Sequence, residues 1–192
     1  MAVWSLTVHG EVVRFDELFA PVPDVVLDIG FGGGEGLIEM AAVRPNEAVI
    51  GLDVHTPGVA NVLEAIEDNG WQHVRVVEGD VLELLPRIPL LSLAGVRLFF
   101  PDPWPKQKQR HRRLARPDVV VQLVDRLRVG GTLHIATDIA DYAKQAQAVC
   151  GAEQRLRGGP VPRPDWRPIT RFERRGLAAG RAPTDLIYER VV

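Results

Sequence analysis

Five aspartates stand where hydrophobic runs of strand length come to an end. Parallel strands end at one edge of a sheet, and doubly wound sheets bind their ligands outside that edge. One such acid is often no more than a helix cap, but five at the same edge predict a binding site. An acid after the second strand can accept hydrogen bonds from both hydroxyls of a ribose. The five, in chain order, are Asp28, Asp53, Asp80, Asp102 and Asp138.

The first of these acids opens a glycine-rich loop, DIGFGGGEG at residues 28–36. Gly30, Gly32 and Gly34 give the backbone room for the close approach of a ligand. A dinucleotide-binding fingerprint would place its third glycine at residue 35, where this chain has Glu35. The loop therefore disfavours an NAD-type dehydrogenase, which remains a rival interpretation.

The elements that must position these residues alternate along the chain. Continuous Val, Ile and Leu runs at 24–30, 48–54, 73–80, 96–102 and 132–138 suit strands covered on both faces. Segments at 35–45, 57–70, 81–88, 116–131 and 139–151 have helical character. Repeated strand–helix units predict an α/β fold with a doubly wound, mostly parallel sheet of about seven strands. Residues 184–192 are expected to close it as an antiparallel edge.

This arrangement resembles the class I methyltransferases, which bind S-adenosylmethionine on a Rossmann-like sheet. The resemblance rests on the glycine-rich loop, the acid after the second strand and the acid in EGD after the third. It implies that Asp28 and the loop glycines lie near the methionine part of the cofactor. It also implies that Asp53 holds the ribose and that Asp80 reaches the adenine amino group.

Asp102 lies in the motif PDPW, between Pro101 and Pro103, which restrict the backbone on both sides. A stiff turn that holds a carboxylate over a cofactor positions reacting groups, and positioning supplies much of what a methyl transfer needs. Similar turns occur in methyltransferases that act on amino groups, which suggests a nitrogen acceptor.

The charge of the chain changes sign directly after this motif. Residues 1–105 hold 5 Lys and Arg against 16 Asp and Glu, whereas residues 106–192 hold 18 against 9. Such asymmetry suggests that the second half presents a basic surface to a polyanion. The segment after PDPW has no acidic residue before Asp118, and its lysines and arginines are expected to contact an RNA backbone. Those assigned to RNA phosphates are Lys108, Arg110, Arg112 and Arg113.

Composition limits the other possibilities. The 192 residues predict a single domain, with residues 1–22 as an N-terminal segment and 151–176 as an irregular insertion on the substrate side. The single cysteine excludes an internal disulfide, and the five histidines lack metal-ligand spacing, so no metal is expected. A targeting peptide and a membrane span are not expected either, which favours a cytoplasmic protein. Monomer and homodimer both remain open.

Several motifs in a fixed order resemble the bacterial tRNA (guanine-N7)-methyltransferases. They are DIGFG, GLDVHTPGV, FFPDPWPK with the following basic run, ATDIADYA and TRFERRG, spread over residues 25–191. The resemblance implies methylation of the guanosine at position forty-six in the tRNA variable loop. It makes Asp102 the catalytic carboxylate, also near the cofactor, and gives substrate contacts to Lys106, Asp138, Thr170, Arg171, Phe172 and Glu173.

Guanine N7 offers a lone pair and has no proton to lose, so the attack needs no general base. Asp102 is then expected to stabilise the positive charge that develops on the purine. Either Asp138 or Glu173 is expected to bind the N1 and N2 donors of the base. The segment QKQRH departs from the Arg-His usual in the family, and the chain begins with few basic residues. A methyltransferase for another nitrogen and a non-catalytic RNA-binding protein are the alternatives.

Overall fold

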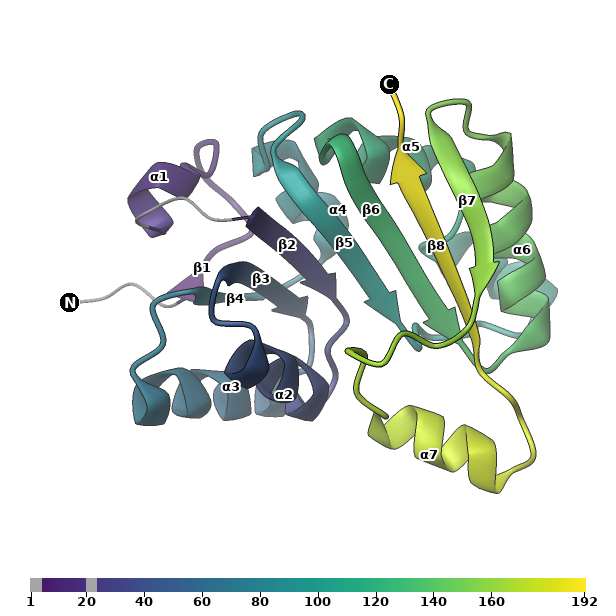
Figure 1. Cartoon of the computed structure of the whole chain (residues 1–192), viewed down its shortest axis with the longest axis horizontal. Coiled ribbons are helices and arrows are strands. Elements are labelled where there is room, and N and C mark those ends of the chain that lie inside the picture. Colours follow the sequence, from purple (N-terminus) through teal and green to yellow (C-terminus); the bar gives the residue numbers. More distant parts are fainter. Residues whose placement is uncertain (1–4, 20–23) are drawn as a thin grey trace.

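The computed structural model describes residues 5–19 and 24–192. They form one eight-stranded sheet in the order β1-β4-β3-β2-β5-β6-β8-β7 (Figure 1). The strands are β1 (Ser5–Leu6), β2 (Asp24–Ile29), β3 (Glu47–Asp53), β4 (Val74–Glu78), β5 (Leu93–Phe99), β6 (Leu127–Thr137), β7 (Leu156–Val161) and β8 (Thr184–Arg190). The α-helices are α1 (Phe15–Leu18), α2 (Glu35–Val43), α3 (Thr56–Asn69), α4 (Val81–Leu84), α5 (Pro117–Arg126), α6 (Ala140–Ala152) and α7 (Arg171–Ala178). Two 3-10 helices, η1 (Leu85–Arg87) and η2 (Gln107–Arg112), complete the set.

The sheet is parallel from β1 to β6 and ends in two antiparallel pairings. β8 runs antiparallel to β6, and β7 runs antiparallel to β8. The chain winds outward from β2 in one direction through β3 and β4, and in the other through β5 and β6, so the topological switch point lies between β2 and β5. The predicted doubly wound sheet with an antiparallel edge is therefore confirmed. The additional strand is β1, which pairs with β4.

Helices cover both faces of the sheet, as the continuous apolar strands predict. In β3, Val49 packs with Leu37 of α2 and Val62 of α3 in one core cluster. Its neighbours Ala48 and Ile50 belong to the larger cluster on the other face, which includes side chains of α4, α5 and α6. The strand is thus buried on both sides, which explains why its sequence does not alternate between apolar and polar residues.

Two boundaries differ from the sequence-based expectation. Residues 151–176 are not an irregular insertion, because they include the regular strand β7 and most of α7. The predicted helix 116–131 stops at Arg126, and Leu127 already belongs to β6, where it pairs with Leu93 of β5. The described part of residues 1–22 contains β1 and α1, and residues 1–4 and 20–22 of that predicted segment lie outside the described residues.

No described helix is long and apolar enough to cross a membrane. Among the same residues, no three His, Cys, Asp or Glu side chains come together as metal ligands would.

Candidate active site

The glycine-rich loop joins β2 to α2 and is held by a hydrogen bond to Asp53, the last residue of β3. Gly30, Gly32 and Gly34 have φ angles of 75°, 63° and 90°, in the region that favours glycine. Asp53 Oδ2 accepts a hydrogen bond from the Gly32 amide at 2.5 Å, and Oδ1 accepts one from the His55 amide at 2.8 Å. Asp53 therefore shapes the loop and still has lone pairs for a ligand.

A cavity of about 700 Å³ opens at the carboxyl edge of the sheet. This size lies within the roughly 300–1,000 Å³ typical of small-molecule sites. Its lining contains four of the five aspartates predicted from the sequence, one from the end of each of the strands β4 and β3 on one side of β2 and β5 and β6 on the other. They are Asp53, Asp80, Asp102 and Asp138. The prediction that these acids share one edge of the sheet is confirmed.

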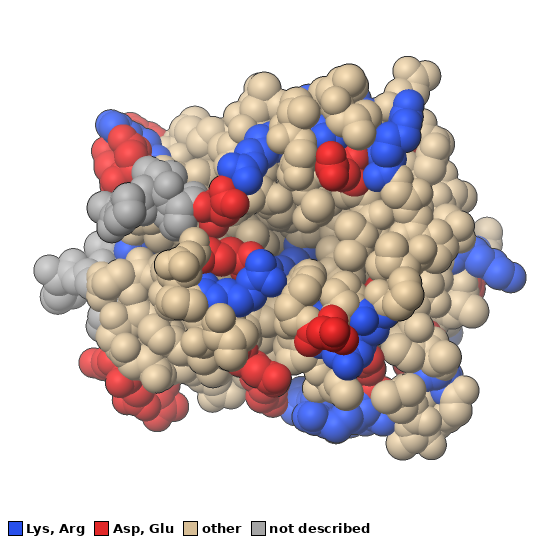
Figure 2. Space-filling model, viewed as in Figure 1, with Lys and Arg blue, Asp and Glu red and all other residues tan. Residues whose placement is uncertain are grey.

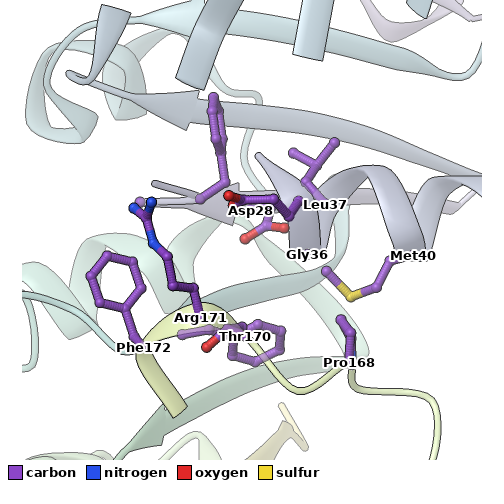
Figure 3. A pocket seen from close by; sticks show the side chains of 12 residues that line it. Asp28, Gly36, Leu37, Met40, Pro168, Thr170, Arg171 and Phe172 are labelled. Atoms are coloured by element: carbon purple, nitrogen blue, oxygen red, sulfur yellow. The ribbon is translucent and has the colours of Figure 1, made fainter. Parts of the chain in front are cut away.

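Asp28 lines a second, smaller space of about 30 Å³ that shares Gly30, Arg171 and Phe172 with the large cavity. Figure 3 shows Thr170, Arg171 and Phe172 facing residues of β2 and α2 across this space. Asp28 belongs to β2 and is 3% exposed. Burial raises the pKa of its carboxyl to about 6, although the guanidinium of Arg97 opposes the shift. The carboxyl is therefore half protonated near pH 6 and mainly ionised at neutral pH.

These residues fit S-adenosylmethionine, the cofactor that the sequence implies. Asp53 ends β3, where it can meet the ribose hydroxyls. Asp80 caps α4 through one oxygen, which accepts from the Leu82 amide at 2.8 Å, and its exposed carboxylate also lines the cavity. The acids around the cavity provide negative charge suited to a sulfonium cation.

The PDPW turn lines the cavity and has a strained conformation. Phe100 and Trp104, on either side of Asp102, have φ angles of 51° and 39°, which residues other than glycine rarely adopt. The turn is held by a hydrogen bond from the Phe100 amide to Ala136 O at 2.7 Å. Asp102 itself is exposed and lines the cavity. Strain of this kind is typical of backbone that positions a functional group.

Arg113 contradicts its predicted role as an RNA contact, because it is 1% exposed. Its guanidinium donates to Pro103 O, Trp104 O and Gln145 Oε1, at distances of 2.8, 3.4 and 2.8 Å. It also pairs with Asp141 of α6 at 2.8 Å. The side chain is therefore an internal brace that fastens the PDPW turn to α6, and it cannot reach a phosphate from this position.

Three other basic residues of η2 and its flanks are exposed at the surface, and a fourth is half-buried. Lys106, Lys108 and Arg112 are exposed. Lys106 is not among the residues that line the cavity, whereas Arg112 lies at its rim with its guanidinium 4.8 Å from the centre of the Trp104 ring. Arg110 is half-buried and pairs with Asp141 at 3.0 Å. Trp104 is neither a core residue nor fully exposed, and it lines the cavity beneath Arg112.

The substrate side is formed by α7 and the turn after it. Asp138 lines the cavity and pairs with Arg181 at 2.7 Å. Thr170 caps α7 and accepts from the Glu173 amide at 3.1 Å. Glu173 is 2% exposed, and its carboxylate is bound to the buried Arg167. The predicted contact of Glu173 with a guanine is therefore contradicted in this structure, because the carboxylate faces the interior.

Two cavity-lining arginines, Arg175 and Arg181, were not predicted as site residues. Arg175 follows Arg171 by four residues, a spacing that places both on one face of a helix. The signal for that helix was the sequence TRFE, a capping-box pattern that starts at Thr170. Lys and Arg side chains, blue in Figure 2, gather near the lower edge of the view, where Figure 1 places α7.

Comparisons with known proteins show which family this chain belongs to. A family model described as "Putative methyltransferase" matches residues 23–186. The chain is 42% identical over 194 residues to a tRNA (guanine-N(7)-)-methyltransferase of Streptomyces avermitilis, which covers 98% of this chain and 67% of the relative. It is 44% identical over 184 residues to the protein of the same name from Thiobacillus denitrificans, covering 94% and 81%. A solved 16S rRNA methyltransferase, KamB, has the same fold, with a TM-score of 0.68, 17% identity and coverage of 95% and 96%.

Proposed function

Since the chain belongs to the bacterial tRNA (guanine-N7)-methyltransferase family, we propose that it transfers a methyl group from S-adenosylmethionine to N7 of a guanosine in tRNA. We also propose that the target is position forty-six, in the variable loop. The observation that supports this function best is that four aspartates at strand ends line one cavity, beside exposed lysine and arginine side chains of η2 and α7. An RNA-binding protein without catalysis has no need for such a cavity.

The cofactor supplies the methyl group when it is bound. We assign its ribose to Asp53, whose carboxylate also fixes the glycine-rich loop. Asp80 is assigned to the adenine amino group. Asp28 lies beside the loop in the small space against α7, and this position supports its assignment to the methionine part. The glycines assigned to the same part are Gly30, Gly32 and Gly34.

Asp102 stabilises charge on the guanine and does not accept a proton from it. Because N7 has no proton, the carboxylate contributes by holding negative charge near the imidazole ring of the purine while that ring becomes cationic. The prolines around Asp102 and the brace from Arg113 keep the carboxylate in place before the substrate arrives. Preorganised charge of this kind needs no rearrangement during the reaction.

Recognition of the base and of the RNA backbone is divided between two groups of residues. Asp138 is assigned to the N1 and N2 donors of guanine, which adenine lacks in that arrangement. Other contacts to the target nucleotide are assigned to Lys106, Thr170, Arg171 and Phe172. The phosphates are assigned to Lys108, Arg110 and Arg112, since the predicted contact of Arg113 is excluded by its burial. The enzyme is expected in the cytoplasm, where tRNA is used, as a monomer or a homodimer.

The test uses purified protein, methyl-labelled S-adenosylmethionine and two unmodified tRNA transcripts, one with guanosine and one with adenosine at position forty-six. The RNA is digested and the labelled nucleoside is identified by chromatography. Label in 7-methylguanosine from the first transcript alone supports the proposal. Label in another nucleoside points to a different nitrogen acceptor, and bound cofactor without transfer points to a non-catalytic RNA-binding protein.

The role of Asp102 is tested in the same assay with Asp102→Asn, which keeps the shape of the side chain and removes its charge. We expect kcat to fall by about 100-fold, a typical loss for one electrostatic contact to a transition state, with tRNA binding retained. Full turnover by this variant would mean that the charge is not needed.

A further inference from the structure

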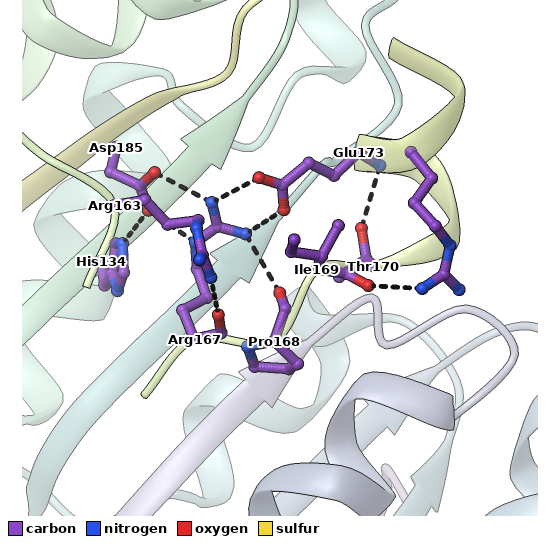
Figure 4. Close-up of polar contacts among 9 residues, drawn as sticks. His134, Arg163, Arg167, Pro168, Ile169, Thr170, Glu173 and Asp185 are labelled. Carbon is purple, nitrogen blue, oxygen red and sulfur yellow. Dashed lines mark hydrogen bonds and ion pairs between the residues drawn. The ribbon is translucent and has the colours of Figure 1, made fainter. Parts of the chain in front are cut away.

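Arg167 is a fully buried arginine in the segment between β7 and α7, outside the cavity. Its relative exposure is 0%, and its guanidinium binds two carboxylates at once. It donates to Asp185 at 2.7 and 3.0 Å and to Glu173 at 2.6 and 3.2 Å (Figure 4). Two such forked pairs use the planar geometry of arginine in a way that lysine cannot reproduce.

The two carboxylates come from different elements. Asp185 belongs to β8, is 2% exposed and lies 2.7 Å from His134 Nε2 of β6. Glu173 lies in the first turn of α7. A capping-box glutamate usually turns back to the backbone of the cap residue, but this one turns into the protein toward Arg167. One guanidinium thus joins α7 to β8 directly and, through Asp185, to His134 of β6.

The helix α7 has few other means of attachment. Every residue of α7 is described, and the two that are buried are Glu173 and Gly176. Its large apolar side chains are not buried, since Phe172, which lines the cavity, is 42% exposed and Leu177 is 49% exposed. The helix therefore lacks the buried apolar stripe that normally docks a surface helix. At eight residues it is also too short to be stable alone.

The position of α7 matters because its first turn forms part of the site. Thr170, Arg171 and Phe172 line the small space opposite Asp28, and Arg171 and Phe172 also line the large cavity. We propose that Arg167 is a positioning residue for methyl transfer, which docks α7 through Glu173 and so holds this wall of the site in place. The inference rests on the proposed function, because the wall belongs to that site.

The chain provides its own probe of helix docking. Trypsin cuts after exposed arginines, and Arg171, Arg174 and Arg175 are exposed in α7. It does not cut before proline, so the bond between Arg167 and Pro168 is resistant and substitution of Arg167 removes no cleavage site. The rate of cleavage in α7, followed by mass spectrometry, therefore reports how long the helix spends undocked.

Three variants are compared with the unsubstituted protein. In Arg167→Met, we expect cleavage in α7 to rise at least tenfold and kcat/KM for tRNA to fall at least tenfold, with a smaller loss of cofactor affinity because Asp53 and Asp80 are untouched. In Arg167→Met with Glu173→Leu, an apolar pair replaces the ion pair and Asp185 keeps His134 as its partner, so the cleavage rate and kcat/KM should both return most of the way to those of the unsubstituted protein. Arg157→Met is the matched control, since Arg157 is exposed on β7, and it should change neither value.

The outcomes separate the possibilities. Unchanged cleavage and activity in Arg167→Met would overturn the proposal. A double variant that resists trypsin but makes no 7-methylguanosine would also overturn it, because the Glu173 carboxylate would then act on the substrate itself. Should Arg167→Met lose cooperative unfolding, Arg167→Lys is measured in its place, with partial undocking expected. If the unsubstituted protein makes no 7-methylguanosine, the proposed function fails, while the trypsin comparison still decides the docking of α7.

Discussion

Two adjacent arginines, Arg112 and Arg113, are expected to respond to alanine substitution in opposite ways. Arg112 is exposed at the rim of the cavity, where its guanidinium lies over the Trp104 ring. Arg113 is buried and braces the PDPW turn. Replacement of Arg113 should therefore lower stability, whereas replacement of Arg112 should weaken RNA binding. The two substitutions remove the same charge from neighbouring positions, so each is a control for the other.

The expected cost of Arg113→Ala follows from its contacts. The substitution leaves Pro103 O, Trp104 O and Gln145 Oε1 without this donor, at about 1–3 kcal/mol for each buried acceptor that finds no replacement. Asp141 is half-exposed, so water can replace its lost partner. A total of roughly 3–5 kcal/mol follows if two or three of these acceptors stay unpaired. In a domain of this size, that corresponds to a fall in Tm of about 6–20 °C.

Arg112→Ala should lower the free energy of unfolding by only about 0.5–1 kcal/mol, the value of an exposed cation–π contact. If Arg112 binds one phosphate, its loss should reduce the slope of log K against log salt concentration for tRNA binding by about 0.7–0.9. The assay combines thermal unfolding of both variants with tRNA binding at four salt concentrations. An Arg113→Ala protein that keeps its Tm and loses the same salt slope as Arg112→Ala would refute the assignment of Arg113 as a brace.

Three glycine and aspartate positions give further predictions. Burial raises the pKa of Asp28 to about 6 from 3.8, so stability falls by up to about 3 kcal/mol as the pH rises from about 4 to above 6. Asp28→Asn removes this loss and should raise Tm at pH 7.5 without cofactor; a lower Tm would contradict the burial argument. In Gly58→Ala the new Cβ would lie 1.8 Å from Gly32 O, so the glycine-rich loop would have to move. Calorimetry should then show cofactor binding weakened at least about 100-fold. An unchanged Kd would mean that the loop does not bind the cofactor. In Gly176→Ala the new Cβ would lie 2.4 Å from Asp138 Oδ2 and would displace that carboxylate. The value of kcat/KM for tRNA should then fall about 100-fold while the cofactor Kd is retained. Equal losses of kcat/KM and of cofactor affinity would mean that the substitution damages the whole fold.

The sequence predicted well where Asp53, Asp80 and the glycine-rich loop lie, because the signals for these positions are local. Asp53 and Asp80 each follow a continuous apolar strand, and parallel strands bring their ends together without further information. The glycine loop between β2 and α2 was equally readable, since few other residues tolerate its backbone angles. These features depend on the order of the elements and little on side-chain packing.

The substrate side was less predictable because tertiary contacts decide it. Arg112 and Arg113 are equivalent in sequence terms, and only the position of α6 explains why one is buried. Strand β7 has the sequence LRGGPV, whose glycines and proline disfavour a strand. It forms at the edge of the sheet, where a proline is tolerated. Glu173 carries the signal of a helix start, but its buried partner Arg167 lies outside that motif.

The insertion of β8 between β6 and β7 has a consequence for biosynthesis. β7 is made before β8, yet its strand partner is β8 and not the earlier β6. A nascent chain that has reached β7 therefore lacks the strand with which β7 pairs in the folded protein, and Asp185, the anchor of Arg167, has not yet been translated. The part of the sheet that carries the residues assigned to the cofactor can fold during synthesis, because β2, β3 and β4 are complete by then. The wall formed by the first turn of α7 is completed last. Under the assignments proposed above, an incomplete chain would hold cofactor before it could methylate tRNA.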